Sequence, residues 1–83
     1  MTQKEATQKL LIEIRGVYNR TERHTDKEIA KEIGITPVSF SRLITGVTVP
    51  NIQTWALIVN KHAKLLGKEK TDKIITELYY ATS

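Results

Sequence analysis

The chain has 83 residues, of which 40% are hydrophobic and 27% are charged, and its formal net charge is +4. These values fit one small domain with a single core and leave little material for a deep substrate cavity. The absence of cysteine excludes a disulfide framework and a thiolate metal site. No apolar run approaches the roughly 20 residues of a membrane span. The polar N-terminus is not typical of a secretory signal.

The first predicted element is a helix over Gln3–Tyr18, whose apolar residues recur at helical spacing and form one broad arc toward the core. These residues are Ala6, Leu10, Leu11, Ile14, Val17 and Tyr18. Ile12 falls on the opposite side, where we expect a single exposed apolar residue. Residues 19–24 then form a loop that contains Arg20 and Arg23.

A second, short helix is predicted between Thr25 as its N-cap and Gly34 as the residue that ends it. Thr25 and Glu28 have the spacing of a capping box, in which each side chain accepts a hydrogen bond from a backbone donor left free at the helix start. Gly34 can adopt the left-handed conformation that often terminates a helix. The apolar residues of the helix share one face: Ile29, Ala30 and Ile33.

A third helix is predicted over residues 37–45, with Thr36 as N-cap, Pro37 at the first helical position and Gly46 as the stop. One side carries the core residues Phe40, Leu43 and Ile44. The other side has no carboxylate and instead offers hydroxyls, methyl groups and one guanidinium, a composition suited to the DNA major groove. The base-reading candidates are Thr36, Pro37, Val38, Ser41, Arg42 and Thr45.

The stretch from residue 28 to residue 51, EIAKEIGITPVSFSRLITGVTVPN, resembles the helix-turn-helix of the lambda-repressor/Cro-like family. The resemblance extends over residues 25–63, roughly half the chain, and implies an all-α, compact five-helix domain with a central helix-turn-helix. The matching positions are Ile29, Ala30, Ile33, Gly34, Ile35, Phe40, Ser41, Arg42, Leu43, Gly46 and Pro50. Family members often carry Gln at the start of the first helix of the pair, where this chain has Asp26, so Thr25 or Lys27 would replace that phosphate contact.

Several donors on or beside the third helix are candidates for contacts to the DNA backbone. They are Arg20, Arg23, Thr25, Lys27, Ser39, Thr48 and Asn51. The alternative for the two loop arginines is a solvated loop in which they pair with Glu22 or Asp26. The alternative for Asn51 is capping of the next helix alone, and both of its roles are compatible.

A fourth helix is predicted over residues 52–66, with Trp55 as a core anchor and His62 at the edge of the buried stripe. The stripe is expected to consist of Ile52, Trp55, Ala56, Val59, Ala63 and Leu66, widened by Ile58 and Leu65. Residues 67–70 are predicted to form a turn. A fifth helix should begin at Thr71 or Asp72 and end near Tyr80.

The fifth helix offers a candidate dimer surface within residues 71–83 of this single domain. Its apolar stripe is Ile74, Ile75, Leu78 and Tyr79. If the stripe exceeds what the fourth helix can cover, the remainder would form a symmetric dimer contact. If the fifth helix packs its whole stripe against the fourth helix, the protein would be a monomer. We expect the homodimer, because two recognition helices double the DNA site.

These features together predict a sequence-specific regulator of transcription that binds a double-stranded DNA operator. The resemblance implies a repressor from a phage or other mobile element, in the cytoplasm of a bacterial cell. We expect no catalytic residue, metal, cofactor, small-molecule substrate or membrane partner. The alternatives are a DNA-binding antitoxin or accessory protein, a helix-turn-helix used only for protein contact, and a small enzyme, for which no residue spacing indicates a site.

Overall fold

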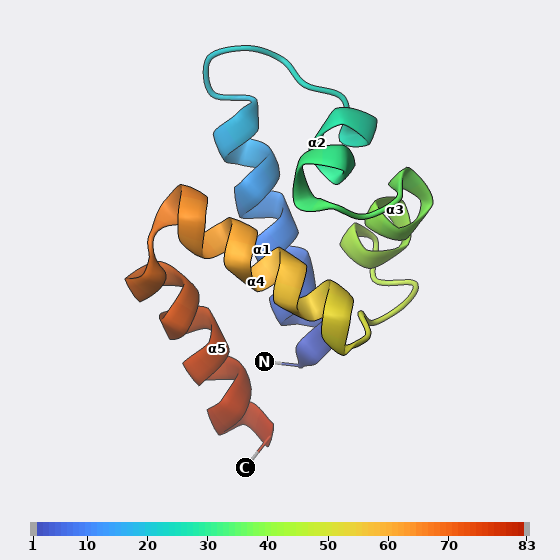
Figure 1. Ribbon diagram of the computed structural model, residues 1–83. Helices are drawn as coiled ribbons and strands as arrows, with labels where there is room; N and C mark the ends of the chain where they lie inside the picture. Colours follow the sequence, from blue (N-terminus) through green and yellow to red (C-terminus); the bar gives the residue numbers. More distant parts are fainter. Residues whose placement is uncertain (1, 83) are drawn as a thin grey trace.

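Five helices build the chain in the computed structural model, which describes the backbone of residues 2–82 and the side chains of residues 2–78 (Figure 1). They are α1 (Gln3–Tyr18), α2 (Asp26–Ile33), α3 (Pro37–Ile44), α4 (Ile52–Leu66) and α5 (Lys68–Thr82). The described residues contain no strand. The predicted all-α, five-helix fold is therefore confirmed.

The core is organised around α1, which contacts each of the other four helices. Figure 1 shows α4 crossing α1, with α2 and α3 on one side and α5 on the other. The buried apolar side chains are Ala6, Leu10, Leu11 and Ile14 of α1, Ile29, Ala30 and Ile33 of α2, Phe40 and Leu43 of α3, Ile58 of α4 and Ile74 of α5. Ile12 is 51% exposed, as its position opposite the apolar arc predicts.

The caps that start α2, α3 and α4 are the ones the sequence predicts. The Thr25 hydroxyl oxygen accepts from the Glu28 N–H at 3.2 Å, and the Thr25 N–H donates to the Glu28 carboxylate at 3.0 Å. These donors, the Thr25 N–H first and its hydroxyl second, hold the pKa of Glu28 below its ordinary value. The ionised Glu28 carboxylate therefore stabilises the folded protein at neutral pH, and this stabilisation is lost as the pH falls through the lowered pKa. A second capping box, Thr2 with Glu5, starts α1.

The buried face of α4 is rotated from the one expected. Ile58 and His62 are fully buried at its centre, whereas Ile52 is 85% exposed and Ala56 is also exposed. Trp55 is half-buried and packs against the core. The expected stripe was wrong for Ile52 and Ala56, whereas its members Trp55 and Val59 do pack against the core. The first half of α4 is apolar on nearly every side, so periodicity alone does not fix which side faces α1.

The turn before α5 is shorter than predicted. Gly67 alone redirects the chain, with φ of 101°, and α5 begins at the next residue. The predicted four-residue turn and the start at Thr71 or Asp72 were therefore wrong. Residues 68–70 are Lys, Glu and Lys, which favour helix once a glycine has made the turn.

Gly46 lies where α1 approaches the end of α3. Its φ is 80°, and the side chain of Gln8 donates a hydrogen bond to the Ile44 carbonyl at 3.1 Å. A Cβ at Gly46 would lie 3.0 Å from the Gln8 amide nitrogen. At Gly34, where φ is 97°, an added Cβ would meet only Leu57 at 3.8 Å.

We therefore expect Gly46→Ala to destabilise the protein more than Gly34→Ala. Both variants strain a left-handed backbone, for about 1 kcal/mol each. Gly46→Ala also displaces the Gln8 hydrogen bond, for about 1 kcal/mol more. Urea unfolding of the two variants measures the difference. An equal loss of unfolding free energy in the two variants would mean that the contact of Gln8 with the end of α3 contributes nothing to stability.

Candidate nucleic-acid interface

The exposed side of α3 is the one predicted from the sequence. Its six base-reading candidates, Thr36, Pro37, Val38, Ser41, Arg42 and Thr45, are all exposed. On the opposite side, Phe40 is fully buried and Leu43 is 3% exposed, so the helix is held against the core by that face. The sequence of α3 contains no Asp or Glu. One helix face thus presents neutral groups and one positive charge to the outside.

The hydroxyl groups on this face differ in what they can still bind. The Thr45 hydroxyl donates to the Ser41 carbonyl at 2.7 Å, so Thr45 presents its methyl group and an acceptor. The Thr36 oxygen accepts from the Ser39 N–H at 3.1 Å and keeps its proton for another partner. Within residues 2–78, the hydroxyl of Ser41 and the guanidinium of Arg42 take part in no hydrogen bond or ion pair, since Thr45 contacts only their backbone carbonyls. Both side chains are therefore free to contact a ligand.

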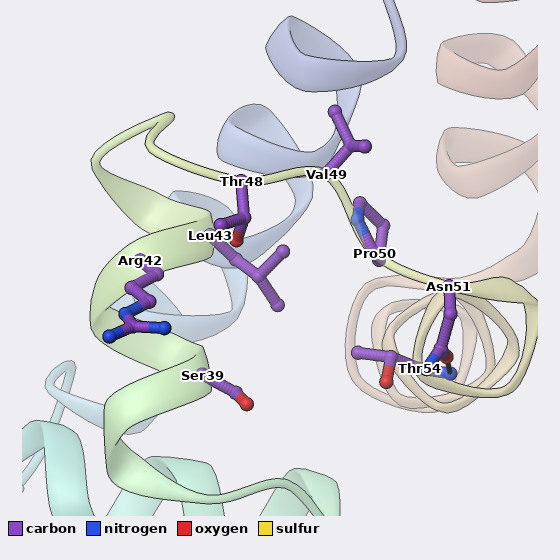
Figure 2. Close-up of a pocket in the computed structure, with 8 residues that line it drawn as sticks. All are labelled: Ser39, Arg42, Leu43, Thr48, Val49, Pro50, Asn51 and Thr54. Atoms are coloured by element: carbon purple, nitrogen blue, oxygen red, sulfur yellow. Dashed lines mark hydrogen bonds between the residues drawn. The ribbon is translucent and has the colours of Figure 1, made fainter.

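A hollow lies between α3 and the start of α4, and it gathers three of the predicted phosphate contacts. Its lining consists of Ser39, Arg42, Leu43, Thr48, Val49, Pro50, Asn51 and Thr54 (Figure 2). Hydroxyls, an amide and a guanidinium supply its polar groups, and no carboxylate does. Figure 2 shows the Val49 side chain pointing away from the side to which Ser39 and Thr54 project.

Asn51 performs its capping role and retains donors for a second one. Its Oδ1 accepts from the Thr54 N–H at 2.8 Å, which leaves the two N–H groups of the amide available. The N-terminus of α4 carries partial positive charge and further unpaired N–H groups at the same place. Thr54 was not among the predicted site residues, although its position three residues after the N-cap is one that an Asn cap contacts.

The other phosphate candidates lie apart from this hollow. Arg20 and Arg23 belong to the exposed loop between α1 and α2, which Figure 1 shows at the far end of α2 from the α3–α4 connection. Lys27 is exposed on the first turn of α2. The Thr25 hydroxyl donates to the Glu28 carboxylate at 3.0 Å and is thus committed to the cap.

The two loop arginines do not form the ion pairs that were their alternative. Asp26 lies 3.8 Å from Arg15 instead, and within the described side chains neither Arg20 nor Arg23 has a carboxylate partner. The loop itself is held by the Asn19 side chain, which accepts from the His24 N–H at 2.6 Å. Arg20 and Arg23 are therefore exposed residues of a loop that the Asn19–His24 hydrogen bond stabilises.

The predicted dimer stripe on α5 is largely covered by the rest of the chain. Ile74 is 4% exposed and belongs to the core, while Ile75 and Leu78 are half-buried. The side chain of Tyr79 lies outside the described residues. Because α5 packs on both α4 and α1, Ile74 is not a surface residue and cannot form part of a dimer contact.

No protein-family model, curated protein or solved structure matches the chain. The resemblance to the lambda-repressor/Cro-like family thus stays a prediction. Across residues 2–82, no helix has the length and apolar character needed to cross a membrane.

Proposed function

We propose that the protein binds double-stranded DNA sequence-specifically and regulates transcription. The observation that carries this proposal is the exposed face of α3, which bears Arg42 and no carboxylate and is fixed to the core by Phe40. A face of this kind suits the major groove, where an acidic side chain near the phosphates would be repelled. α2 and α3 would act as the helix-turn-helix, with α3 as the recognition helix.

Arg42 has the central role in base recognition. Its guanidinium is the only group on this face that can donate to both major-groove acceptors of a guanine. Val38 is 60% exposed and presents methyl groups suited to the methyl of thymine. Ser41 can donate to or accept from a base edge. These three residues would set the operator sequence.

The hollow beside α3 would receive a phosphate of the DNA backbone. Ser39, Thr48 and the Asn51 amide surround it with donors, and the N-terminus of α4 adds a favourable dipole. On the other side of α3, the first turn of α2 and the α1–α2 loop would add Lys27, Arg20 and Arg23. Such contacts on both sides of a recognition helix fix its register in the groove.

A regulator of this kind would act by occupying its operator. We propose repression, in a bacterial or phage setting, because the helix-turn-helix stretch resembles phage repressors. The same docking also serves activators. The sign of regulation would be read from a reporter gene placed behind an operator selected from random duplexes.

The proposal predicts that Arg42→Ala weakens binding to the selected operator by about 1–3 kcal/mol and relaxes base preference at one position. Arg23→Ala should weaken selected and random duplexes alike, because it removes a phosphate contact. Lys64→Ala is the matched control, since it removes one positive charge from the exposed side of α4 near its C-terminus. An Arg42→Ala protein with unchanged affinity and preference would exclude α3 as the reading helix.

A further inference from the structure

The C-terminal end of α3 is joined to α1 by a side-chain hydrogen bond. The last four carbonyls of a helix have no partner within the helix itself. In α3, three of these carbonyls accept from backbone N–H groups of residues 45–48, which follow the helix directly. The fourth, the carbonyl of Ile44, accepts from the side-chain amide of Gln8 at 3.1 Å, across 36 positions of the sequence.

Gly46 leaves the space in which this amide lies. A Cβ at Gly46 would be 3.0 Å from the Gln8 amide nitrogen and 3.2 Å from the Cδ of Lys4. Lys4 and Gln8 are four residues apart in α1, so they lie on one side of that helix. Gln8 is half-buried at this contact, and its hydrogen bond is therefore partly shielded from water.

We propose that Gln8 is a positioning residue that sets the orientation of α3 for base reading, a role that rests on the proposed function. α3 has only eight residues, and its buried side chains are Phe40 and Leu43. Apolar contacts have no preferred direction, so they allow a short helix to tilt slightly. A hydrogen bond requires both a distance and an angle. The bond from Gln8 therefore supplies a directional contact at the C-terminal end of α3.

Most of the contacts proposed for the DNA backbone come from elements other than α3. Arg20 and Arg23 lie in the α1–α2 loop, and Asn51 lies at the start of α4. A change in the tilt of α3 would leave these phosphate contacts in place and displace the side chains that read bases. Arg42 would be the most sensitive, because a bidentate contact with guanine tolerates little displacement. Loss of the Gln8 bond should thus lower base preference without lowering affinity for an arbitrary duplex.

The experiment compares Gln8→Met with the intact protein on a duplex selected from a random pool and on a shuffled duplex. Methionine is close to glutamine in size but has no N–H group to donate. We expect the ratio of the two affinities to fall about three- to tenfold. The affinity for the shuffled duplex and its dependence on salt should stay unchanged. Gln8→Lys restores a donor that can reach a C-terminal carbonyl and should recover most of the ratio, since its added charge acts on both duplexes alike.

Thr71→Val is the matched control for a loss of stability without a change at α3. Thr71 is buried in α5, and its hydroxyl forms a hydrogen bond with His62. This variant should keep the ratio of affinities at a temperature where it is folded, and circular dichroism checks the fold of every variant. Residual dipolar couplings of the free protein give a second readout. The couplings of α3 should change relative to those of α1 in Gln8→Met and stay the same in Thr71→Val.

The outcomes separate the role of Gln8 from the proposed function itself. If the intact protein prefers the selected duplex and Gln8→Met keeps that preference, the positioning role is wrong and DNA binding stands. Equal losses of affinity on both duplexes would assign Gln8 to the backbone contacts and would also overturn the positioning role. Unchanged couplings of α3 in Gln8→Met would do the same. An intact protein with no preference between the duplexes would overturn the proposed function, and this role with it.

Discussion

Replacing His62 by alanine is expected to lower the free energy of unfolding by about 3 kcal/mol, because it opens a cavity and removes two buried hydrogen bonds. His62 is fully buried, with Nε2 2.6 Å from a Glu13 carboxylate oxygen and Nδ1 2.5 Å from the Thr71 hydroxyl. Thr71 in turn donates to the Gly67 carbonyl at 3.0 Å. This cluster joins α1, α4 and α5.

The loss should be concentrated at α5, which docks on the other helices partly through this cluster. Urea unfolding followed by Trp55 fluorescence measures the total change, and amide hydrogen exchange should show α5 opening more easily than α2. Thr71→Val removes only the hydroxyl and should cost about 1 kcal/mol. His24→Ala is the matched control, because the half-buried His24 ring contacts Glu22 and Tyr18 near the α1–α2 loop and takes no part in this cluster; it should change stability by about 1 kcal/mol or less.

An unchanged stability in His62→Ala would contradict the structural account of this cluster. A loss of stability without faster exchange in α5 would place the contribution of His62 in the α1–α4 contact instead. The effect on DNA binding should be small once the protein is folded, because His62 lies on the buried side of α4 and the proposed interface lies at its N-terminus.

The parts of the fold that depend on near neighbours could be predicted from the sequence. Thr25 and Glu28 cap α2 as expected, Thr36 caps α3 through the Ser39 N–H, and Gly34 ends α2 in the left-handed conformation. Each of these features involves residues within one or two turns. The two faces of α3 were predictable for the same reason, since Phe40 and Leu43 define the buried side by spacing alone.

The features that depend on distant contacts were not predictable. His62 was placed at the edge of a stripe, because its buried position depends on Glu13, which is 49 residues away in the chain. The phase of α4 depends on where α1 and α5 lie, and an almost entirely apolar segment gives no local signal of that. The exposed face of α3 was predicted better than the core of α4, because its residues lie on one short helix whose buried side is defined by local spacing.

The expected dimer surface illustrates the same limit. The stripe on α5 was recognisable from the sequence, but whether it faces a second copy or the same chain depends on α4 and α1. For Ile74, one residue of the stripe, the structure shows burial within the same chain. Ile52 was assigned to the core because it shares helical spacing with Trp55, Ala56 and Val59, and its 85% exposure is visible only in the structure.

The salt dependence of duplex binding distinguishes a DNA-binding protein from one that uses α2 and α3 for protein contact. If Arg20, Arg23 and Lys27 each neutralise one phosphate, the log–log slope of affinity against salt should be about −2.7 per chain, at roughly −0.9 for each phosphate. Affinity should then fall roughly 40-fold between about 50 and 200 mM salt. A duplex selected from a random pool should bind more tightly than a shuffled one, with a similar slope.

Arg23→Ala provides the internal control for this measurement, because it should flatten the slope by about 0.9 on both duplexes. Arg42→Ala should instead reduce the difference in affinity between the selected and the shuffled duplex. For the intact protein we expect a slope near about −2.7 together with a clear preference for the selected sequence. A slope near zero for the intact protein, with no preference between the two duplexes, would contradict DNA binding and favour a helix-turn-helix that serves protein contact.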